Sequence, residues 1–156
     1  MAPGPRLDDR HLEAWRALLT AHRRILDRLE HELRTDHGLS LSEYEVLMLL
    51  GQAEGNRCRM GELARHLLVT PGGVTRLADR LESAGLLCRR PCPTDRRSIE
   101  LVLTPEGRRR LRAAGPDHLR GVARYFGVHL SDDEADSLTR LLGRVAAAAT
   151  GSATVT

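Results

Sequence analysis

The sequence contains no lysine, few aromatic residues and no long hydrophobic run. Aromatic residues make up 3% of the chain, which argues against a base-stacking platform for single-stranded nucleic acid. The longest apolar runs have five residues, as at 46–50, whereas a helix that spans a bilayer needs ~20. No basic, apolar and small-residue leader opens the chain. We therefore expect a cytoplasmic protein that is neither secreted nor inserted in a membrane.

The motifs of common enzymes and metal sites are missing as well. The chain has no G-x-G-x-x-G, H-E-x-x-H or G-x-S-x-G pattern, and without lysine it has no phosphate-binding loop ending in Gly-Lys. Its seven histidines lack H-x-x-x-H spacing, and its three cysteines form no C-x-x-C pair. An odd number of cysteines also fits a reducing cytoplasm better than a disulfide framework. The sequence therefore predicts neither an enzyme nor a bound metal or cofactor.

Arginine supplies all 24 basic residues, and its distribution along the chain is uneven. Residues 57–112 contain 13 arginines and 6 acidic residues, whereas the remainder contains 11 arginines and 15 acidic residues. The formal net charge of +3 therefore conceals a strongly basic middle segment. This asymmetry predicts a module that binds a polyanion and is carried on acidic flanking segments.

Long amphipathic helices are predicted near both ends of the chain. Apolar residues recur at helical spacing over residues 12–33. A second apolar stripe, over residues 138–145, follows Ser131 and Glu134, which have the spacing of a capping box. One small domain cannot bury both apolar faces, so the sequence predicts that the end helices of two chains pack together.

Helix signals recur through the middle of the chain. Ser42 and Glu45 have capping-box spacing before a second helix, and residues 60–67 have the pattern of a short third helix. Thr104, followed by a proline, predicts the start of a fifth helix. Pro116 should introduce a kink into that helix, because proline removes an amide and clashes with the preceding turn.

A fourth helix and a hairpin are predicted between these helices. Thr70 followed by Pro71 is typical of a helix start, since it supplies a hydroxyl cap and a proline where no amide is needed. Residues 86–90 and 99–103 have the pattern of strands, and the polar stretch 91–98 between them predicts a long turn. The short third helix, the capped fourth helix and the arginine-tipped hairpin follow one another in the order of a winged helix-turn-helix.

The predicted fold class is therefore mainly α with a small β-hairpin wing. In this arrangement the fourth helix enters the major groove of DNA through its amino-terminal half, where small and polar residues can approach base edges and phosphates. The long planar heads of the wing arginines fit a narrow minor groove. The candidate DNA-binding residues are Thr70, Gly72, Gly73, Thr75, Arg76 and Arg80 on the helix and Arg96 and Arg97 on the wing.

Each of these arginines could instead be an ordinary surface residue that forms salt bridges and does not contact DNA. For Arg80 the expected partners are Asp79, Glu82 or Asp95. We expect Asp95 to position an arginine, because its carboxylate would repel a phosphate. Arg89 and its neighbour Arg90 point to opposite faces of a strand, so we expect one structural role and one contact with phosphate between them.

The most specific stretch of the sequence, residues 62–105, resembles the MarR family of bacterial transcription regulators. The family's wing signature, D-x-R before a strand that ends in Leu-Thr, is matched by Asp95, Arg97, Leu103 and Thr104. Its recognition-helix core, T-R-x-x-D-R-L-E, stands at residues 75–82, and the segment LSLSEYEVL is similar to its second helix. The resemblance extends over roughly residues 15–145.

This resemblance implies an obligate homodimer in which the first, fifth and sixth helices of two chains interleave. Two winged lobes would then bind a pseudo-palindromic operator with half-sites ~10 bp apart. Members of the family usually repress transcription and release DNA when a small ligand or an oxidant arrives. The implied organisation is an N-terminal dimerisation helix (1–36), a winged helix-turn-helix lobe (37–104), C-terminal dimerisation helices (105–149) and a disordered tail (150–156).

Three residues of the first helix are candidates for an effector pocket, which the resemblance places between the dimer helices and the winged lobe. Trp15 and His22 are seven residues apart and share a helix face, with Arg16 beside them. A cationic, a titratable and a flat aromatic side chain would suit a phenolic or aromatic carboxylate. The plainer alternative is that they pack in the dimer interface.

Two further interpretations remain open from the sequence. Cys88 and Cys92 lie at the base of the wing among arginines, and positive charge favours the reactive thiolate. A bond there or between subunits would distort the wing, as in a redox-responsive regulator, although hydroperoxide sensors of the family carry their cysteine on the first helix. Cys58 is expected in a short strand beside the helix-turn-helix.

The second interpretation is that the winged helix is a protein-interaction module whose arginines dock an acidic partner.

Overall fold

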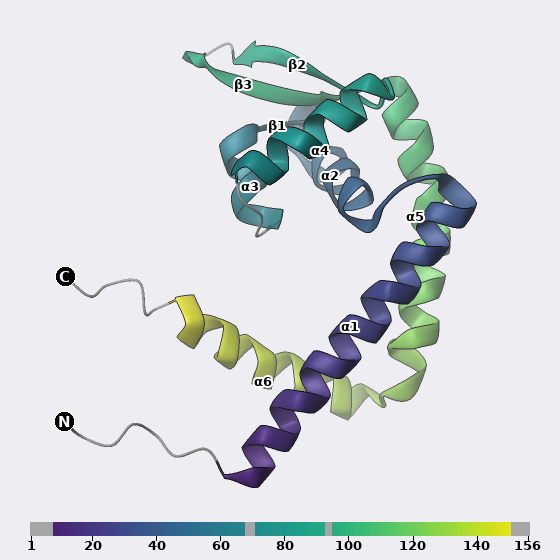
Figure 1. Ribbon diagram of the computed structural model, residues 1–156, viewed down its shortest axis with the longest axis vertical. Helices are drawn as coiled ribbons and strands as arrows, with labels where there is room; N and C mark the ends of the chain where they lie inside the picture. Colours follow the sequence, from purple (N-terminus) through teal and green to yellow (C-terminus); the bar gives the residue numbers. More distant parts are fainter. Residues whose placement is uncertain (1–7, 68–70, 93–94, 151–156) are drawn as a thin grey trace, which may run out of the picture. The chain divides into compact units, whose positions relative to one another are not determined.

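The computed structural model describes residues 8–67, 71–92 and 95–150, and in these ranges it is mostly helical with one small sheet (Figure 1). This confirms the predicted fold class. The chain divides into two compact units, one up to Gly121 and one from Val122, which are described separately. The α-helices are α1 (Asp9–His37), α2 (Leu41–Gln52), α3 (Met60–Leu67), α4 (Pro71–Ser83), α5 (Pro105–Tyr125) and α6 (Asp132–Thr150). The strands are β1 (Arg57–Arg59), β2 (Leu87–Cys92) and β3 (Asp95–Leu103), and two short 3-10 helices cover Glu54–Asn56 and Gly127–His129.

Helix α1 is the long N-terminal helix that the apolar spacing predicted. The Asp8 side chain caps its start by accepting a hydrogen bond from the His11 amide at 3.0 Å. Gly38 ends it with φ of 64°, a left-handed conformation that favours glycine, and donates its amide to the Arg34 carbonyl. Leu29 and Leu33, near the C-terminal end, are its buried residues. The first half of α1 therefore contributes little to the core of the chain.

Helix α2 begins two residues earlier than the sequence predicted. The capping box consists of Ser40 and Glu43, which exchange hydrogen bonds between side chain and backbone at 2.9 and 3.2 Å. Ser42 and Glu45 have the same S-x-x-E spacing, so the pattern alone did not distinguish the two starts. With the start at Ser40, Leu41 is the first residue of the helix, and its side chain is buried in the core.

The sheet has three antiparallel strands in the order β1-β3-β2. Leu87 pairs with Leu103 and Cys58 with Leu101, so β1 is the short strand expected around Cys58. The hairpin strands are longer than predicted, because residues 91–92 and 95–98 of the predicted turn belong to β2 and β3. Residues 93–94 of that predicted turn lie outside the described ranges. Strand β2 is at the edge of the sheet, where the missing amide of its proline is tolerated.

The core of the first unit lies where α2, α3, α4 and the sheet meet. Its largest fully buried side chains come from all of these elements, and each is at most 2% exposed: Val46, Leu47, Leu50, Leu63, Val74, Leu81, Leu87, Cys92 and Leu101. Burying one leucine side chain in this way stabilises a fold by about 1.5–3 kcal/mol. Gly85, with φ of 71°, then ends the turn after α4 and leads directly into the wing.

Helix α5 begins at the predicted cap. The Thr104 hydroxyl donates to the Gly85 carbonyl at 2.7 Å and accepts from the Gly107 amide at 3.0 Å, so it joins the helix start to the end of α4. The helix continues from Pro105 to Tyr125, so Pro116 does not end it.

The second unit is built around α6. Ser131 and Glu134 form the predicted capping box, with the Ser131 amide donating to the Glu134 carboxylate at 2.9 Å. The apolar stripe of α6 is exposed in the single chain, with Leu141 45%, Leu142 37% and Val145 60% exposed. Thr150 is the last residue of α6, and the rest of the predicted disordered tail lies outside the described ranges. Among the described helices, none is both long and apolar enough to cross a membrane.

Candidate nucleic-acid interface

Helix α4 presents opposite faces to the core and to the outside. Val74, Leu77 and Leu81 are at most 6% exposed, because their helical spacing brings them to one side. Thr75 and Arg76 are exposed on the other side. Gly72 is exposed as well, and a Cβ there would meet no atom within 4 Å. Of the other helix candidates, Gly73 is half-buried in the first turn, and Thr70 lies outside the described residues.

Arg80 is bound to a partner that the sequence did not suggest. Its Nε donates to Glu43 Oε1 at 2.8 Å, whereas the sequence pointed to Asp79, Glu82 or Asp95. Partial burial raises the pKa of Glu43, but the Ser40 amide and the Arg80 guanidinium outweigh it and leave that pKa below its ordinary value. The pair joins the cap of α2 to α4, while the Arg80 side chain stays 56% exposed.

Arg89 joins the wing to α4. Its guanidinium contacts Asp79 Oδ1 at 2.6 Å and also binds the Glu82 carboxylate, and its amide donates to Glu82 Oε1 at 2.9 Å. The hydrogen bond from the Arg89 backbone is the largest contribution that lowers the pKa of Glu82. Of the two adjacent arginines, Arg89 therefore has the structural role, and Arg90 is exposed. The 75–82 motif contained this signal, because its two acidic residues lie three positions apart on one helix face.

The wing is formed by β2 and β3. Arg96 and Arg97 stand in β3, directly after Asp95. The Asp95 carboxylate accepts a hydrogen bond from the Ser98 hydroxyl at 2.6 Å, so it braces the strand three residues further on. The chain therefore carries its candidate groove-binding residues on two neighbouring elements of one unit, α4 and the hairpin that follows it (Figure 1).

The cysteines do not form the disulfide that C-x3-C spacing suggested. Cys88 and Cys92 are on the same strand, β2, and four residues of extended chain separate their Cα atoms by about 13 Å. A disulfide requires Cα atoms about 4.4–6.8 Å apart, so the prediction of a bond between them within this strand is wrong. Cys92 is 2% exposed. Burial, and then Glu62, raise the pKa of Cys58, which disfavours its thiolate.

The effector candidates lie on α1. Arg16 and His22 line one hollow of about 550 Å³ together with other residues of the same helix, namely Leu19, Thr20, Arg23 and Arg24. Trp15 is next to Arg16 in the chain and is 55% exposed, but it does not line this hollow. The structure therefore brings together two of the three predicted residues.

A polar cluster that the sequence did not reveal lies where α1 meets α2 and α5. His37 Nε2 is 2.8 Å from Asp117 Oδ2, and the His118 and Tyr44 rings pack at a tilt of 39° with their centroids 4.5 Å apart. Burial lowers the pKa of His118, so its neutral form is favoured. These residues are about 80 positions apart in the chain, and no local pattern connects them. Among the described residues, no group of three or more His, Cys, Asp or Glu could hold a metal ion.

Comparison with known proteins agrees with this architecture. A sequence model of the MarR family matches residues 37–98. The HTH-type transcriptional repressor YetL of Bacillus subtilis is 32% identical over 137 residues, which are 88% of this chain and 81% of YetL.

Two solved structures from Streptomyces coelicolor are similar over most of the chain. AbsC, a MarR family transcriptional regulator, is 32% identical with a TM-score of 0.89, over 94% of this chain and 99% of AbsC. Sco3205, a MarR family regulator solved in complex with DNA, is 29% identical with a TM-score of 0.88, over 94% of this chain and 91% of its own. Its winged helix-turn-helix and its similarity to a repressor over most of its length show that the chain belongs to the MarR family of DNA-binding transcription regulators, which are not enzymes.

Proposed function

We propose that this MarR-family regulator is a cytoplasmic homodimeric repressor that binds a pseudo-palindromic operator and releases it when a small aromatic acid binds. The observation that carries the proposal is the outer face of α4, with Gly72, Thr75 and Arg76 exposed beside the wing of the same unit. A helix whose apolar side is already buried in its own lobe is free to enter a major groove with the other side.

The exposed apolar residues at both ends of the chain support the homodimer. Trp15, Leu18 and Leu19 of α1 are 37–55% exposed, and Leu142 and Val145 of α6 are 37% and 60% exposed. Such residues gain free energy when a second copy covers them. Two lobes in one dimer would engage successive major grooves, with half-sites ~10 bp apart.

The residues of the interface divide into two roles. Arg76 is the candidate for reading guanine, because its side chain is exposed on the face of α4 that is turned away from the core. The backbone near Gly72 and Gly73, together with Thr75, approaches phosphates. Arg80 reaches DNA only with the part of its side chain that Glu43 leaves exposed. Arg96 and Arg97 enter the minor groove, held in place by a wing that Arg89 joins to α4.

Recovery of the genomic DNA that the purified protein binds tests the proposal. Fluorescence anisotropy then compares the recovered operator with a scrambled duplex, and a change of 5 bp in half-site spacing should abolish tight binding. Arg76→Ala should reduce the preference for the operator, and Arg97→Ala should weaken binding by about 1–3 kcal/mol with the dimer intact. Equal affinity for operator and scrambled duplex would contradict the proposal and favour an acidic protein partner instead.

The ligand is the finer part of the proposal. Arg16 and His22 on one hollow offer a cation and a second donor to a carboxylate, and Trp15 stands next to them. A ligand there acts by favouring one separation of the two recognition helices, and a differential affinity of about 1–3 kcal/mol is enough to shift operator occupancy substantially.

Fluorescence of Trp15, the single tryptophan and the chain neighbour of Arg16, serves as a probe beside this hollow. Titration with a panel of benzoic and phenolic acids should change the emission and release the operator, and Arg16→Gln should abolish both effects. Arg28→Gln, an exposed arginine of α1 that does not line the hollow, serves as the matched control. Unchanged emission and unchanged DNA binding across the panel would remove the aromatic acid from the proposal.

A further inference from the structure

Arg80 of α4 is held at one end of its guanidinium by a residue of another helix. Its Nε donates to Glu43 Oε1 of α2 at 2.8 Å, and no other side-chain hydrogen bond joins Arg80 to the described residues. The terminal nitrogens Nη1 and Nη2 are therefore available, and the side chain is 56% exposed. An arginine fixed through Nε keeps a planar pair of donors at its free end.

Glu43 is itself fixed by the cap of α2. Its second oxygen, Oε2, accepts the Ser40 amide at 2.9 Å, and its side chain is 14% exposed. Partial burial raises the pKa of Glu43, but the Ser40 amide and the Arg80 guanidinium outweigh it, so the carboxylate is charged at neutral pH. One oxygen thus binds the cap and the other binds Arg80. The arginine therefore has a well-ordered anchor in a different helix.

The anchored arginine lies on the same side of α4 as Arg76. Val74, Leu77 and Leu81 form the buried stripe of this helix, whereas Arg76 and Arg80 are exposed and stand one turn apart. Arg76 forms no ion pair with the described residues. The outer face of α4 therefore carries two arginines with different freedom, one unanchored and one oriented before any DNA is present.

The free end of Arg80 has the geometry that a guanine requires. Nη1 and Nη2 lie in one plane and can donate together to O6 and N7 of guanine in the major groove. A side chain that is already held loses less conformational freedom when it binds, so its contact is stronger than that of an unanchored arginine. The anchor is therefore expected to increase the preference for a particular sequence.

We propose that Glu43 is a positioning residue for base recognition, which holds Nε of Arg80 so that Nη1 and Nη2 face a guanine of the operator half-site. The inference rests on the proposed function, since it requires the major groove of DNA on the outer face of α4. Glu43 itself contacts no DNA, and the sequence-based candidates did not include it. The cap of α2 thereby takes part in sequence preference through a residue of the recognition helix.

Fluorescence anisotropy of the full-length protein with its operator and a scrambled duplex tests the inference. Glu43→Gln keeps an oxygen for the Ser40 amide and removes the charge that holds Arg80. The preference for the operator should fall about 2- to 10-fold, the factor that corresponds to ordering one long side chain. Affinity for the scrambled duplex should stay the same or rise, because a negative charge is removed. Loss of structure would instead weaken binding to both duplexes.

A double-mutant cycle shows whether Glu43 acts through Arg80. Arg80→Lys keeps the positive charge but loses the planar pair of donors, so it should reduce the preference for the operator as well. Adding Glu43→Gln to Arg80→Lys should then cause no further loss, because the two residues act as one unit.

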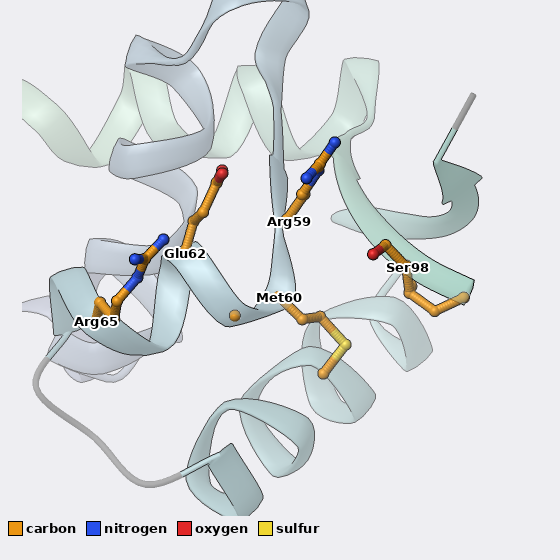
Figure 2. Close-up of a pocket in the computed structure, with 7 residues that line it drawn as sticks. Arg59, Met60, Glu62, Arg65 and Ser98 are labelled. Carbon is orange, nitrogen blue, oxygen red and sulfur yellow. The ribbon is translucent and has the colours of Figure 1, made fainter. Parts of the chain in front are cut away.

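Two control variants match these changes elsewhere in the chain. Glu134→Gln removes the same charge from the capping box of α6, where Glu134 accepts the Ser131 amide, and should leave the preference unchanged. Arg65→Lys replaces an exposed arginine of α3 that lines a hollow of about 340 Å³ beside β3, and no α4 residue lines this hollow (Figure 2). It should also leave the preference unchanged.

The analogue 7-deazaguanine locates the contact, because it lacks the N7 acceptor and leaves the phosphates unaltered. It replaces each guanine of the operator in turn. At one position it should weaken binding by the wild type and have a much smaller effect on Glu43→Gln and Arg80→Lys. A guanine that Arg76 contacts should instead give the same loss in all three proteins. If no position distinguishes the wild type from the two variants, the contact with guanine is refuted.

The remaining outcomes separate the inference from the proposed function. If Glu43→Gln keeps the wild-type preference while the wild type still distinguishes its operator, the positioning role is refuted and the DNA-binding proposal stands. If the wild type has no preference for the operator, both proposals fall together. A further loss when Glu43→Gln is added to Arg80→Lys would also refute the inference, because Glu43 would then act independently of Arg80.

Discussion

The winged lobe and the helices at the chain ends differ in how far their apolar side chains are exposed. In the lobe, Leu47, Leu63 and Leu101 come from a helix, a second helix and a strand, and each is 0% exposed. In the end helices, Trp15 is 55% and Val145 60% exposed. The lobe completes its core within one chain, whereas several apolar residues of the end helices are exposed in the described part of the chain. A region that is apolar yet exposed is typical of an oligomer interface.

The same contrast applies to polar contacts. The lobe ties its elements together with long-range pairs, such as Arg80 with Glu43 and Arg89 with Asp79. At the start of α6, by contrast, Ser131 and Glu134 bond to each other within one helical turn. The geometry that presents α4 is thus determined inside one chain, and we infer that the spacing between two such helices depends on the end helices.

The largest expected effect tests the apolar face of α6. Val145→Asp places a charge on that face and should weaken dimerisation by about 3–5 kcal/mol, because an unpaired charge in an interface loses its hydration. Analytical ultracentrifugation over a range of concentrations measures the effect. Thr139→Asp, at an exposed polar position of the same helix, is the control and should remain dimeric. If Val145→Asp sediments as the wild type does, this face is not an interface.

A somewhat smaller effect is expected in the lobe core. Leu47→Ala removes a side chain with 0% exposure and should lower the free energy of unfolding by about 2–5 kcal/mol, from lost burial and the cavity left behind. Urea unfolding followed by circular dichroism measures it. Leu19→Ala, 47% exposed on α1, is the matched control, and its effect should grow with protein concentration if a second chain covers it. If both variants lose the same free energy of unfolding at every protein concentration, the proposed difference between a lobe core buried within one chain and end helices covered by a second chain is wrong.

Gly107→Ala tests how closely the start of α5 packs against the lobe. A Cβ at this position would collide with the Leu86 carbonyl oxygen and come within 2.9 Å of the Leu86 carbonyl carbon, and backbone atoms cannot easily give way. We expect a loss of about 1–3 kcal/mol in stability, measured by thermal unfolding. Gly72→Ala, where the added Cβ meets nothing within 4 Å, should instead stabilise α4 by about 0.5–1 kcal/mol. Equal effects at the two glycines would show that α5 does not pack closely at Gly107.

The smallest effect concerns pH. The pKa of Glu43 in the fold is below its ordinary value of 4.5, so its carboxylate contributes stability above that pH and loses it as the pH falls. Glu43→Gln should therefore show a decrease in unfolding free energy between pH 7 and pH 3 that is smaller by about 1 kcal/mol, the usual size of a cap interaction. Urea titrations at several pH values measure the difference. Glu13→Gln, on the exposed part of α1, is the control, and an identical pH profile for wild type and Glu43→Gln would contradict the role of the pair.

Sequence reasoning succeeded where the signal was local. The cap before Pro105 and the capping box at Ser131 each lie within four residues of the helix they start, and both are present in the structure. It failed where two local patterns were equivalent, as with the two overlapping S-x-x-E pairs before α2. It could not find the Arg80–Glu43 or His37–Asp117 pairs, because their partners are 37 and 80 residues apart.

What the sequence determined by itself is the kind of each helix and strand and their order along the chain, although not the bounds of α2 or of the hairpin strands. Caps, prolines and apolar spacing act over a few residues, so they can be recognised without knowledge of the fold. What only the tertiary structure decided is which charges neutralise one another and which remain exposed for a partner. That depends on distances between elements that the chain brings together from far apart, as in the pair of Arg80 and Glu43.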